Sequence, residues 1–571
     1  MRKPPRRRQR NQSDPKQMLI FIGASMIFLS VWQSFMPPPA PVNQAPVVSG
    51  ELQAPQTVNG TINDLSASSL AGVSQADHLR SNTLSPVRNL QTLEAPLVQN
   101  VTINSRGQIS KWINLEEQYA QITDNHISPY ILADDSPNSP FVPPLLEIDI
   151  NGQRHLADYQ VKSAKEGAVT LNSKDSQLYV ERRFEVDANL YAVNMTITVK
   201  NISNVPAQVE LIGITRGAQS LSDGGGSMFS PPLNLLESLC ATSDGLERDP
   251  LTSITSKRED SDPLSFDNVK WFGVDNRYFM SAMSSESRVR CVQSERIVDA
   301  RLEVALTPDY APISTRGIFY RNSLLPNAEY SHTVNFYMGP KRLEILNQHR
   351  PSLDEAIDFG IFSPICVPML YAMRAFFSFI NNWGIAIILL TLLVKLFTMP
   401  LTIKQYQSMA KMKALQPEMN EIKEKYQKSD PARFQQETMA LYKKHGANPI
   451  SGCLPMVVMM PIYFALYRTI FSAVELYQAP FFGWLADLSK PDPYFITPII
   501  LGGLMLIQAR LQPNPSMDPV QRKMMTVFMP GFFSLMMLFL PSGLVLYILV
   551  NTVLGLFQQR YTIRKQEVAA V

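Results

Sequence analysis

The sequence has few of the residues on which most enzyme active sites are built. It contains four cysteines and six histidines among 571 residues. No two cysteines have the close spacing of a metal site, and no histidine belongs to an H-E-x-x-H motif. A P-loop and a G-x-S-x-G nucleophile elbow are also missing. These absences argue against metal-dependent hydrolysis and ATP-driven work. They predict a protein that is not an enzyme and that needs no cofactor or metal.

Charge is low overall but unevenly placed. The formal net charge of +3 does not indicate a nucleic-acid-binding protein. The first ten residues nevertheless hold six cations and no acid. The apolar residues 18–36 follow, a length that suits a membrane span. Because no small-residue cleavage site comes after them, we expect an uncleaved anchor at 18–36, with residues 1–17 in the cytoplasm.

The next part of the chain changes character twice. Residues 37–95 are rich in Pro, Ser, Gln, Asn and Ala, which predicts a disordered linker on the periplasmic side. Residues 96–350 contain alternating, β-rich segments separated by turn residues. This pattern predicts one exported antiparallel β-sandwich domain. Cys240 and Cys291 lie within it and are able to pair in an oxidising compartment, but spacing alone does not settle whether they do.

The last third is apolar again and predicts a five-helix transmembrane core. The candidate spans are 383–401, 450–474, 495–511, 522–540 and 542–559. The lysine-rich loop 402–448 is expected in the cytoplasm, and the more acidic loop 475–494 outside. The tail 560–571 is basic and is again expected inside. With the anchor, this arrangement gives six spans and two cytoplasmic termini.

Two segments do not fit the simple pattern of spans. Residues 363–382 are long enough to cross, but crossing would invert every later loop. We therefore expect 351–382 to contain an amphipathic helix lying in the outer interface. In the loop 402–448, an apolar stripe with three- and four-residue steps is followed by Asp430-Pro431. That combination predicts a cytoplasmic helical hairpin, which we expect to bind anionic lipid or a ribosome.

Lys395 is the sharpest polar feature of this apolar part. An ammonium group at the bilayer centre costs about 3 kcal/mol on insertion scales. The candidate spans contain no Asp or Glu away from their ends to pair with it. Thr391 and Thr398 lie on the same helical face, four residues before and three residues after. Two explanations remain open from spacing alone: the lysine snorkels to the cytoplasmic surface, or it faces a polar cavity between helices.

At this point the residues resemble a known family, the YidC membrane protein insertases with their mitochondrial and chloroplast relatives. The resemblance is dense from about 353 to 565. It is carried by NNWGIAIILLTLLVKLFTMPLTIKQYQSMAKMKALQP (381–417), NPISGCLPMVVMMPIYFALY (448–467), SAVELYQAPFFGWLADLSKPDPYFITPI (472–499) and FLPSGLVLYILVNTVLGLFQQ (539–559). The order of anchor, linker, β domain and helical core is similar to the Gram-negative form with a large periplasmic domain.

The resemblance implies a mechanism and partners. The family's core helices enclose a hydrophilic groove, open to the cytoplasm and to lipid, that inserts and chaperones inner-membrane proteins without consuming nucleotide. Lys395 matches the groove cation, which is usually arginine. The other matching groove positions are Thr391, Tyr547, Asn551, Leu454, Tyr463 and Met505. The implied partners are nascent membrane proteins, the Sec translocon with its accessory SecDF complex, the ribosome and the lipid bilayer, with no direct contact to nucleic acid.

Two other function classes are alternatives to an insertase. A secondary transporter or channel with a polar intramembrane cavity predicts inverted repeats and ionisable pairs near the midplane, and the sequence has neither feature. An anchored binding module, whose spans merely hold the β domain, leaves the polar stripe around Lys395 unexplained. An insertase is therefore the favoured prediction.

Overall fold

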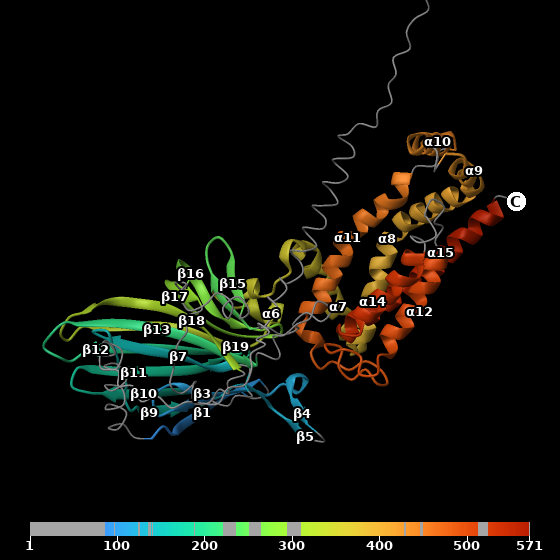
Figure 1. Cartoon of the computed structure of the whole chain (residues 1–571). Helices are drawn as coiled ribbons and strands as arrows, with labels where there is room; N and C mark the ends of the chain where they lie inside the picture. The colour runs from blue at the N-terminus through green and yellow to red at the C-terminus, as the bar shows by residue number, and fades with distance from the viewer. Residues whose placement is uncertain are drawn as a thin grey trace, which may run out of the picture.

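The computed structural model describes residues 86–569 with several gaps. The gaps are 96–97, 124–125, 135–138, 140, 188, 221–235, 251–263, 294–309, 427–429, 446–448 and 512–522. The predicted anchor at 18–36 and N-terminus at 1–17 lie outside the described residues, as does the predicted linker up to residue 85. Within the described part, strands come first along the chain and helices follow, as Figure 1 shows.

The first half of the described chain is a β domain. Its longer strands are β1 (Asn89–Ala95), β2 (Gln99–Asn104), β3 (Ile109–Asn114), β6 (Tyr130–Ala133), β7 (Phe141–Ile150), β9 (Gln160–Lys165), β10 (Ala168–Lys174), β11 (Leu178–Asp187), β12 (Ala192–Asn201), β13 (Ala207–Ser220), β14 (Glu237–Ala241), β15 (Leu246–Pro250), β16 (Ser265–Asp275), β17 (Phe279–Gln293), β18 (Tyr310–Leu324) and β19 (Glu329–Pro340). The short strands are β4 (Gln121–Thr123), β5 (His126–Ser128) and β8 (Gln153–Arg154). The predicted β-rich domain is thereby confirmed.

All pairings of the main 17-stranded sheet are antiparallel except β6 with β7. One run of neighbours is β9–β10–β11–β12–β19. A second run is β1–β2–β3–β6–β7–β13–β18. The long strand β17 joins the two runs, because residues 279–284 pair with β19 and residues 290–293 pair with β18.

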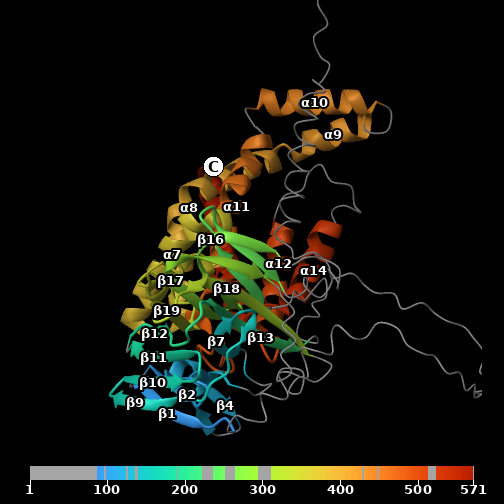
Figure 2. The same cartoon turned by 90° about the vertical axis from the view of Figure 1, so that its left-hand side faces the viewer.

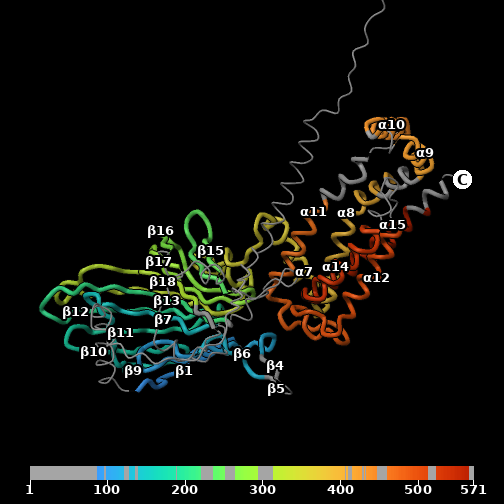
Figure 3. Tube along the Cα trace, in the orientation of Figure 1, coloured from blue at the N-terminus to red at the C-terminus, as the bar shows by residue number. Residues whose placement is uncertain are grey.

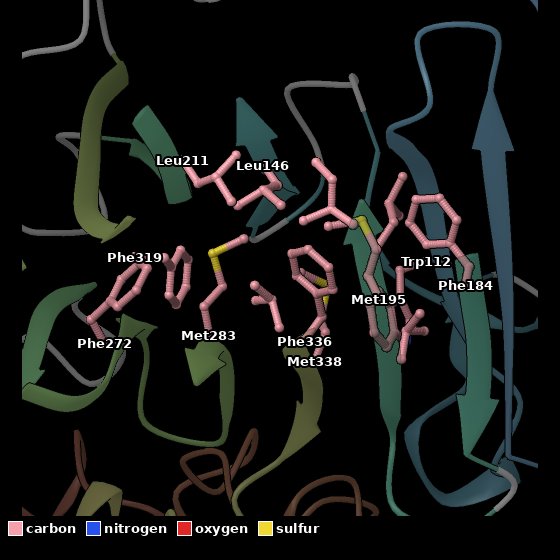
Figure 4. Packing of buried hydrophobic residues seen from close by; sticks show 14 of the residues in the cluster. Trp112, Leu146, Phe184, Met195, Leu211, Phe272, Met283, Phe319, Phe336 and Met338 are labelled. Carbon is pink, nitrogen blue, oxygen red and sulfur yellow. The ribbon is translucent and has the colours of Figure 1, made fainter. Parts of the chain in front are cut away.

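Alternation along the strands builds one hydrophobic core. In β11, Leu178, Val180 and Phe184 are buried on one face together with Arg182, while the residues that alternate with these four are at least partly exposed. Side chains from both runs of strands meet in the same cluster, and Figure 4 shows Leu146 and Leu211 facing Met283 and Phe336 across it. The two-residue period of a half-buried strand is the feature that made this domain predictable from sequence.

Two expectations about the β domain are resolved. The linker was expected to continue to residue 95, but β1 occupies Asn89–Ala95 and pairs along its length with β2. That expectation was wrong because one short strand buries only Leu93 and Ala95 and leaves little apolar pattern to detect. Cys240 and Cys291 form a disulfide between β14 and β17, with 6.1 Å between their Cα atoms.

The second half is helical. Its helices of eight or more residues are α7 (Ser363–Ile380), α8 (Trp383–Ala414), α9 (Gln416–Tyr426), α10 (Pro431–Lys444), α11 (Pro449–Ser472), α12 (Ile496–Leu511), α14 (Met529–Met537) and α15 (Ser542–Ala569). A π-helical turn, η5 (Met524–Phe528), precedes α14, and the short helix α6 (Leu343–Leu346) follows the last strand. Figures 1 and 2 place the β domain at one end of the helical bundle and the hairpin α9–α10 at the other.

The helix bounds differ from the predicted spans mainly by extension. Helix α8 continues through Pro400 to Ala414, and α15 continues to Ala569. By length and composition, three described helical stretches suffice to cross a membrane: Gly360–Ile380, Trp383–Gln405 and Ser542–Thr562. Helices α12 and α14 are apolar but shorter. Length and composition therefore do not separate α7 from the predicted spans.

The β domain and the helical bundle are joined by an aromatic socket, formed by Tyr119, Tyr130, Tyr278 and Phe279. Tyr477, in the loop after α11, inserts its ring among them. Its ring centroid lies 5.1 Å from that of Tyr278 and 5.3 Å from that of Phe279. Burial in this socket raises the pKa of Tyr278 to about 12. The socket is therefore a closely packed aromatic contact, in which Tyr119, Tyr278 and Phe279 are buried.

Charged residues surround the socket. Arg374, near the middle of α7, donates from Nε to Oε1 of Glu475 at 2.9 Å and forms a second ion pair with Glu344 on α6. Arg277 donates from Nε to the carbonyl oxygen of Phe471 at 2.6 Å, which satisfies an end carbonyl of α11. Its guanidinium also lies 3.7 Å from the Phe471 ring centroid. The β domain therefore contacts one end of α11 directly. In Figure 3 this end of α11 lies beside α7.

Candidate functional site

The candidate site lies between α8 and α15, which pack side by side in the same direction. Three contacts along them share one sequence offset of 156 residues. Lys395 pairs with Asn551 and Thr402 with Gln558 at this offset. A Cβ on Gly543 would touch Ile387 at 3.4 Å, again 543 − 387 = 156. A constant offset means that the two helices are parallel and in register, with contacts repeating at about two turns.

Lys395 and Asn551 form the central contact of this pair. The Lys395 ammonium donates to Asn551 Oδ1 at 3.1 Å. The hydroxyl of Tyr463, on α11, also lies close to the Asn551 side chain. Lys395 is only half-buried, and within the described part of the chain it forms no salt bridge. Its charge is therefore held in place by a neutral amide and is not cancelled by a carboxylate.

The remaining predicted site residues divide into groups. Tyr547 is buried in the helical cluster, and Tyr463 and Met505 pack against that cluster, partly exposed. Thr391 is 2 % exposed and donates its hydroxyl to the carbonyl of Ile387, one turn earlier in its own helix. It therefore packs inside the bundle as a satisfied hydroxyl. Leu454 belongs to α11, but its side chain lies outside the described residues.

The line of contact between α8 and α15, called the seam below, is polar in one half only. Towards the β domain the seam consists of Ile387 against Gly543, and the loop after α11 covers it. Ser542 donates its hydroxyl to the carbonyl of Asp487, and the Gly543 N–H donates to the carbonyl of Leu488. Towards the hairpin the seam carries Lys395 and then Thr402. The end near the β domain is therefore apolar and closed by hydrogen bonds, and the other half is polar.

Thr402 and Gln558 were not identified from the sequence as site residues. Gln558 donates from Nε2 to the Thr402 hydroxyl and, at 3.4 Å, to the carbonyl of Met399. The signal that was available is the seven-residue step from Lys395 to Thr402 and from Asn551 to Gln558. Only the pairing of α8 with α15 gives this step a meaning, and sequence alone does not show that pairing.

The predicted helical hairpin is present, formed by α9 and α10. Leu415, Met419 and Ile422 pack against Leu441 and Tyr442 of the opposite helix. Asp430 caps α10 by accepting the Arg433 N–H at 3.0 Å. These residues therefore hold the two helices of the hairpin together.

Nothing in the described residues suggests a metal centre, since no group of three or more His, Cys, Asp or Glu is placed to hold an ion. Arg468 of α11 forms an ion pair with Asp358 at 3.2 Å, just before α7. Its charge is thus balanced beside the β domain.

Comparison with known proteins adds to this geometry. A family model described as the YidC periplasmic domain matches residues 92–372, and one described as the 60Kd inner membrane protein matches 375–569. A membrane protein insertase YidC of Geotalea daltonii is 36% identical over 404 residues, which cover 70% of this chain and 71% of that protein. One of Syntrophus aciditrophicus is 31% identical and covers 96% of this chain and 99% of its own length.

The chain belongs to the YidC family of membrane protein insertases. This membership confirms the resemblance noted in the sequence and weighs against the transporter and binding-module alternatives. The boundary between the two family models falls at 372–375, inside α7. Helix α7 is therefore the element that connects the β domain to the YidC core.

Solved structures give weaker likenesses. A crystal structure of an active YidC insertase covers 86% of this chain and 97% of its own, at 17% identity and a TM-score of 0.34. A putative aldose 1-epimerase of Escherichia coli K12 covers 45% of this chain, at 8% identity and a TM-score of 0.27. At these TM-scores neither likeness bears on function.

Proposed function

We propose that this chain inserts integral membrane proteins into the inner membrane and helps them fold, through a hydrophilic groove between α8, α11 and α15. The observation that carries the proposal is Lys395, an ammonium group in a long apolar helix whose hydrogen-bond partner among the described residues is the neutral amide of Asn551. A cation in low dielectric attracts acidic and polar groups more strongly than the same cation in water. Such a site suits the hydrophilic flank of an arriving membrane protein.

The distribution of polar residues supports a one-sided groove. The seam between α8 and α15 is polar on the hairpin side and closed by the outer loop near the β domain. A groove open only to the cytoplasm shortens the distance over which a hydrophilic segment meets hydrocarbon. Release into lipid then needs only the apolar gain of the substrate's own span, so no nucleotide is required.

Contacts between distant segments support the proposed topology. Tyr477 and Glu475 touch the β domain, so the loop 475–494 and that domain lie on the same side of the membrane. The chain between them must then cross an even number of times. Helices α8 and α11 supply two crossings, and a crossing by α7 would make three. We therefore place α7 in the outer interface.

The same counting applies to the last helices. Ser542 and Gly543 bond to residues 487–490 of the outer loop, so α15 begins outside. Between these points α12 and the η5–α14 segment supply two crossings. This gives five core spans, and with the anchor at 18–36 it leaves both termini in the cytoplasm and the β domain in the periplasm.

Partners follow from the same arrangement. The exposed lysines of the hairpin α9–α10 lie on the cytoplasmic side in this topology, where anionic lipid headgroups and ribosomes are available. We propose that the chain receives nascent membrane proteins there, either alone or from the Sec translocon with SecDF. Insertion by the purified full-length protein in nucleotide-free liposomes tests whether the core works alone.

Replacement of Lys395 tests the groove. We expect Lys395→Arg to insert a small acidic-tailed substrate at a rate close to that of the parent, because the charge is kept. Lys395→Ala and Lys395→Glu should lower insertion by about ten-fold or more, since an ionic attraction in partly buried surroundings is lost or reversed. Insertion into liposomes and growth of an insertase-depleted cell measure this.

Lys490→Ala is the matched control, because that lysine is 71% exposed in the outer loop. It should change neither readout. Full activity of Lys395→Ala in a folded protein, on every acidic substrate, would contradict a groove that depends on this cation.

A further inference from the structure

The contact between Thr402 and Gln558 repeats the contact between Lys395 and Asn551 two turns nearer the hairpin. On both α8 and α15 the two contacts are seven residues apart, which is about 10.5 Å along the helix at 1.5 Å per residue. Thr402 donates its hydroxyl to the carbonyl of Met399 at 3.0 Å, so its oxygen is free to accept from Gln558. The second contact therefore joins an amide to a hydroxyl, and neither group is charged.

The two successive glutamines of this turn each use only half of their side-chain amide. Gln558 donates from Nε2 to α8, and Gln559 donates from Nε2 to the carbonyl of Leu511, the last residue of α12. The Oε1 atoms of both are buried, and neither has a hydrogen-bond partner among the residues that the structure describes. Gln559 is 2 % exposed. A buried carbonyl oxygen without a donor has lost its hydrogen bonds to water without replacement, so a bound donor group would be favoured there.

These oxygens complement Lys395 chemically. An amide oxygen accepts from N–H groups, whereas an ammonium attracts carboxylates and carbonyl oxygens. The N–H groups of an unfolded polypeptide backbone are the donors that any arriving segment carries. They are also the groups that most need a partner where water becomes scarce.

We infer that the Thr402–Gln558 contact is a second binding point of the groove, which accepts backbone and side-chain N–H groups of uncharged polar segments before they reach Lys395. The inference rests on the proposed insertase function and adds a substrate class to it. Acidic flanks depend on Lys395, and neutral polar flanks depend on the Gln558 oxygen. Thr402 positions that amide by accepting its N–H.

Cross-linking at two depths tests the order of contact. A photo-crosslinking amino acid is placed at position 395, at 558, or at the control position 557, where the phenylalanine is 70% exposed. Ribosome-bound chains of increasing length are then offered to the full-length protein in membrane vesicles. Because an extended chain spans about 3.3 Å per residue, position 558 should react with chains about three residues shorter than position 395 requires.

Each outcome decides something. Reaction at 558 first, without reaction at 557, supports the second binding point. Reaction at 395 with none at 558 overturns it and leaves the proposed function intact. Absence of reaction at both 395 and 558 overturns the proposed function itself, and this inference with it.

Substitutions separate substrate binding from helix attachment. Gln558→Leu removes the amide oxygen and the bonds to Thr402 and Met399, whereas Thr402→Val keeps that oxygen and removes the Gln558 bond together with the hydroxyl's own bond to Met399. With a neutral, Asn- and Ser-rich tail, Gln558→Leu should lower insertion about five-fold, the effect of one hydrogen bond of about 1 kcal/mol. Thr402→Val should have a smaller effect, and an acidic-tailed substrate should be less sensitive to both. Equal losses from the two variants on both tails would mean that Gln558 only holds α15 to α8.

Discussion

At the scale of the residue, the uncommon feature is a cation whose partner is an amide. A buried or half-buried lysine beside a carboxylate would form a neutral pair and attract little else. Lys395 instead donates to Asn551 Oδ1, which fixes the ammonium position and leaves its full charge. Asn551 in turn contacts Tyr463, so three helices contribute to the placement of one charge. In the proposed groove, attraction of acidic substrates would therefore depend on a neutral residue at position 551.

Asn551→Asp tests this argument by supplying the missing counter-charge. The new carboxylate would sit at hydrogen-bond distance from Lys395 and neutralise it. We expect insertion of an acidic-tailed substrate to fall about as far as in Lys395→Ala, while a neutral-tailed substrate is inserted at a rate within about two-fold of the parent. The measurement is parallel insertion of the two substrates into liposomes.

Asn551→Gln is the matched control, because it keeps a neutral amide at the same position. It should be less harmful than Asn551→Asp on acidic tails even though it changes side-chain length. If the aspartate variant inserts acidic tails as well as the parent does, the charge of Lys395 has no part in selecting them.

At the scale of the element, sequence patterns predicted those features that depend on a single segment. Alternation located strands such as β11, and continuous apolar runs located α8 and α15. The polar stripe around Lys395 was visible for the same reason. Features that depend on two segments were missed: β1 needs β2 to be recognised as a strand, and Gln558 needs α8 to be recognised as a site residue. Residues far apart in sequence acquire a shared role only through packing.

Helix α7 is a case in which length and composition alone mislead. They fit a membrane span, whereas the charges of the later loops and the contacts of α7 argue against a crossing. Arg374, near its middle, pairs with Glu475 and Glu344 beside the β domain. A spanning α7 would carry that arginine to the bilayer centre, far from both acids. The placement of one helix thus decides the sidedness of every loop that follows it.

Cysteine labelling tests this placement. In a chain with Cys366→Ser and Cys453→Ser, we introduce Tyr494→Cys in the outer loop or Met439→Cys in the hairpin, positions that are 66% and 62% exposed. A membrane-impermeant maleimide added outside should label the first and spare the second until the membrane is opened. Labelling of the hairpin variant in intact vesicles of known orientation would instead mean that α7 crosses.

At the scale of the whole molecule, the β domain and the helical bundle form one connected body. The socket around Tyr477, the Arg374–Glu475 ion pair and the Arg277 contact to Phe471 all act on the segment that ends α11. That helix also carries Tyr463, which contacts Asn551 in the site. The β domain is therefore placed to hold the outer end of a helix that lines the proposed groove.

Tyr477→Ala measures how much this connection contributes. Removing a ring that four aromatic residues surround should cost about 3 kcal/mol, because packing contacts are lost and a cavity is left. In the full-length protein in detergent, we expect the β domain to unfold at a lower temperature and proteases to separate it from the helices sooner. Tyr477→Phe keeps the ring and should lose less than half as much.

Tyr494→Ala, in the same loop but 66% exposed, is the surface control and should change stability by no more than about 0.5 kcal/mol. If Tyr477→Ala matches this control, the socket does not fasten the domain. The end of α11 would then be held to the β domain by the Arg277 contact to Phe471, which does not depend on Tyr477.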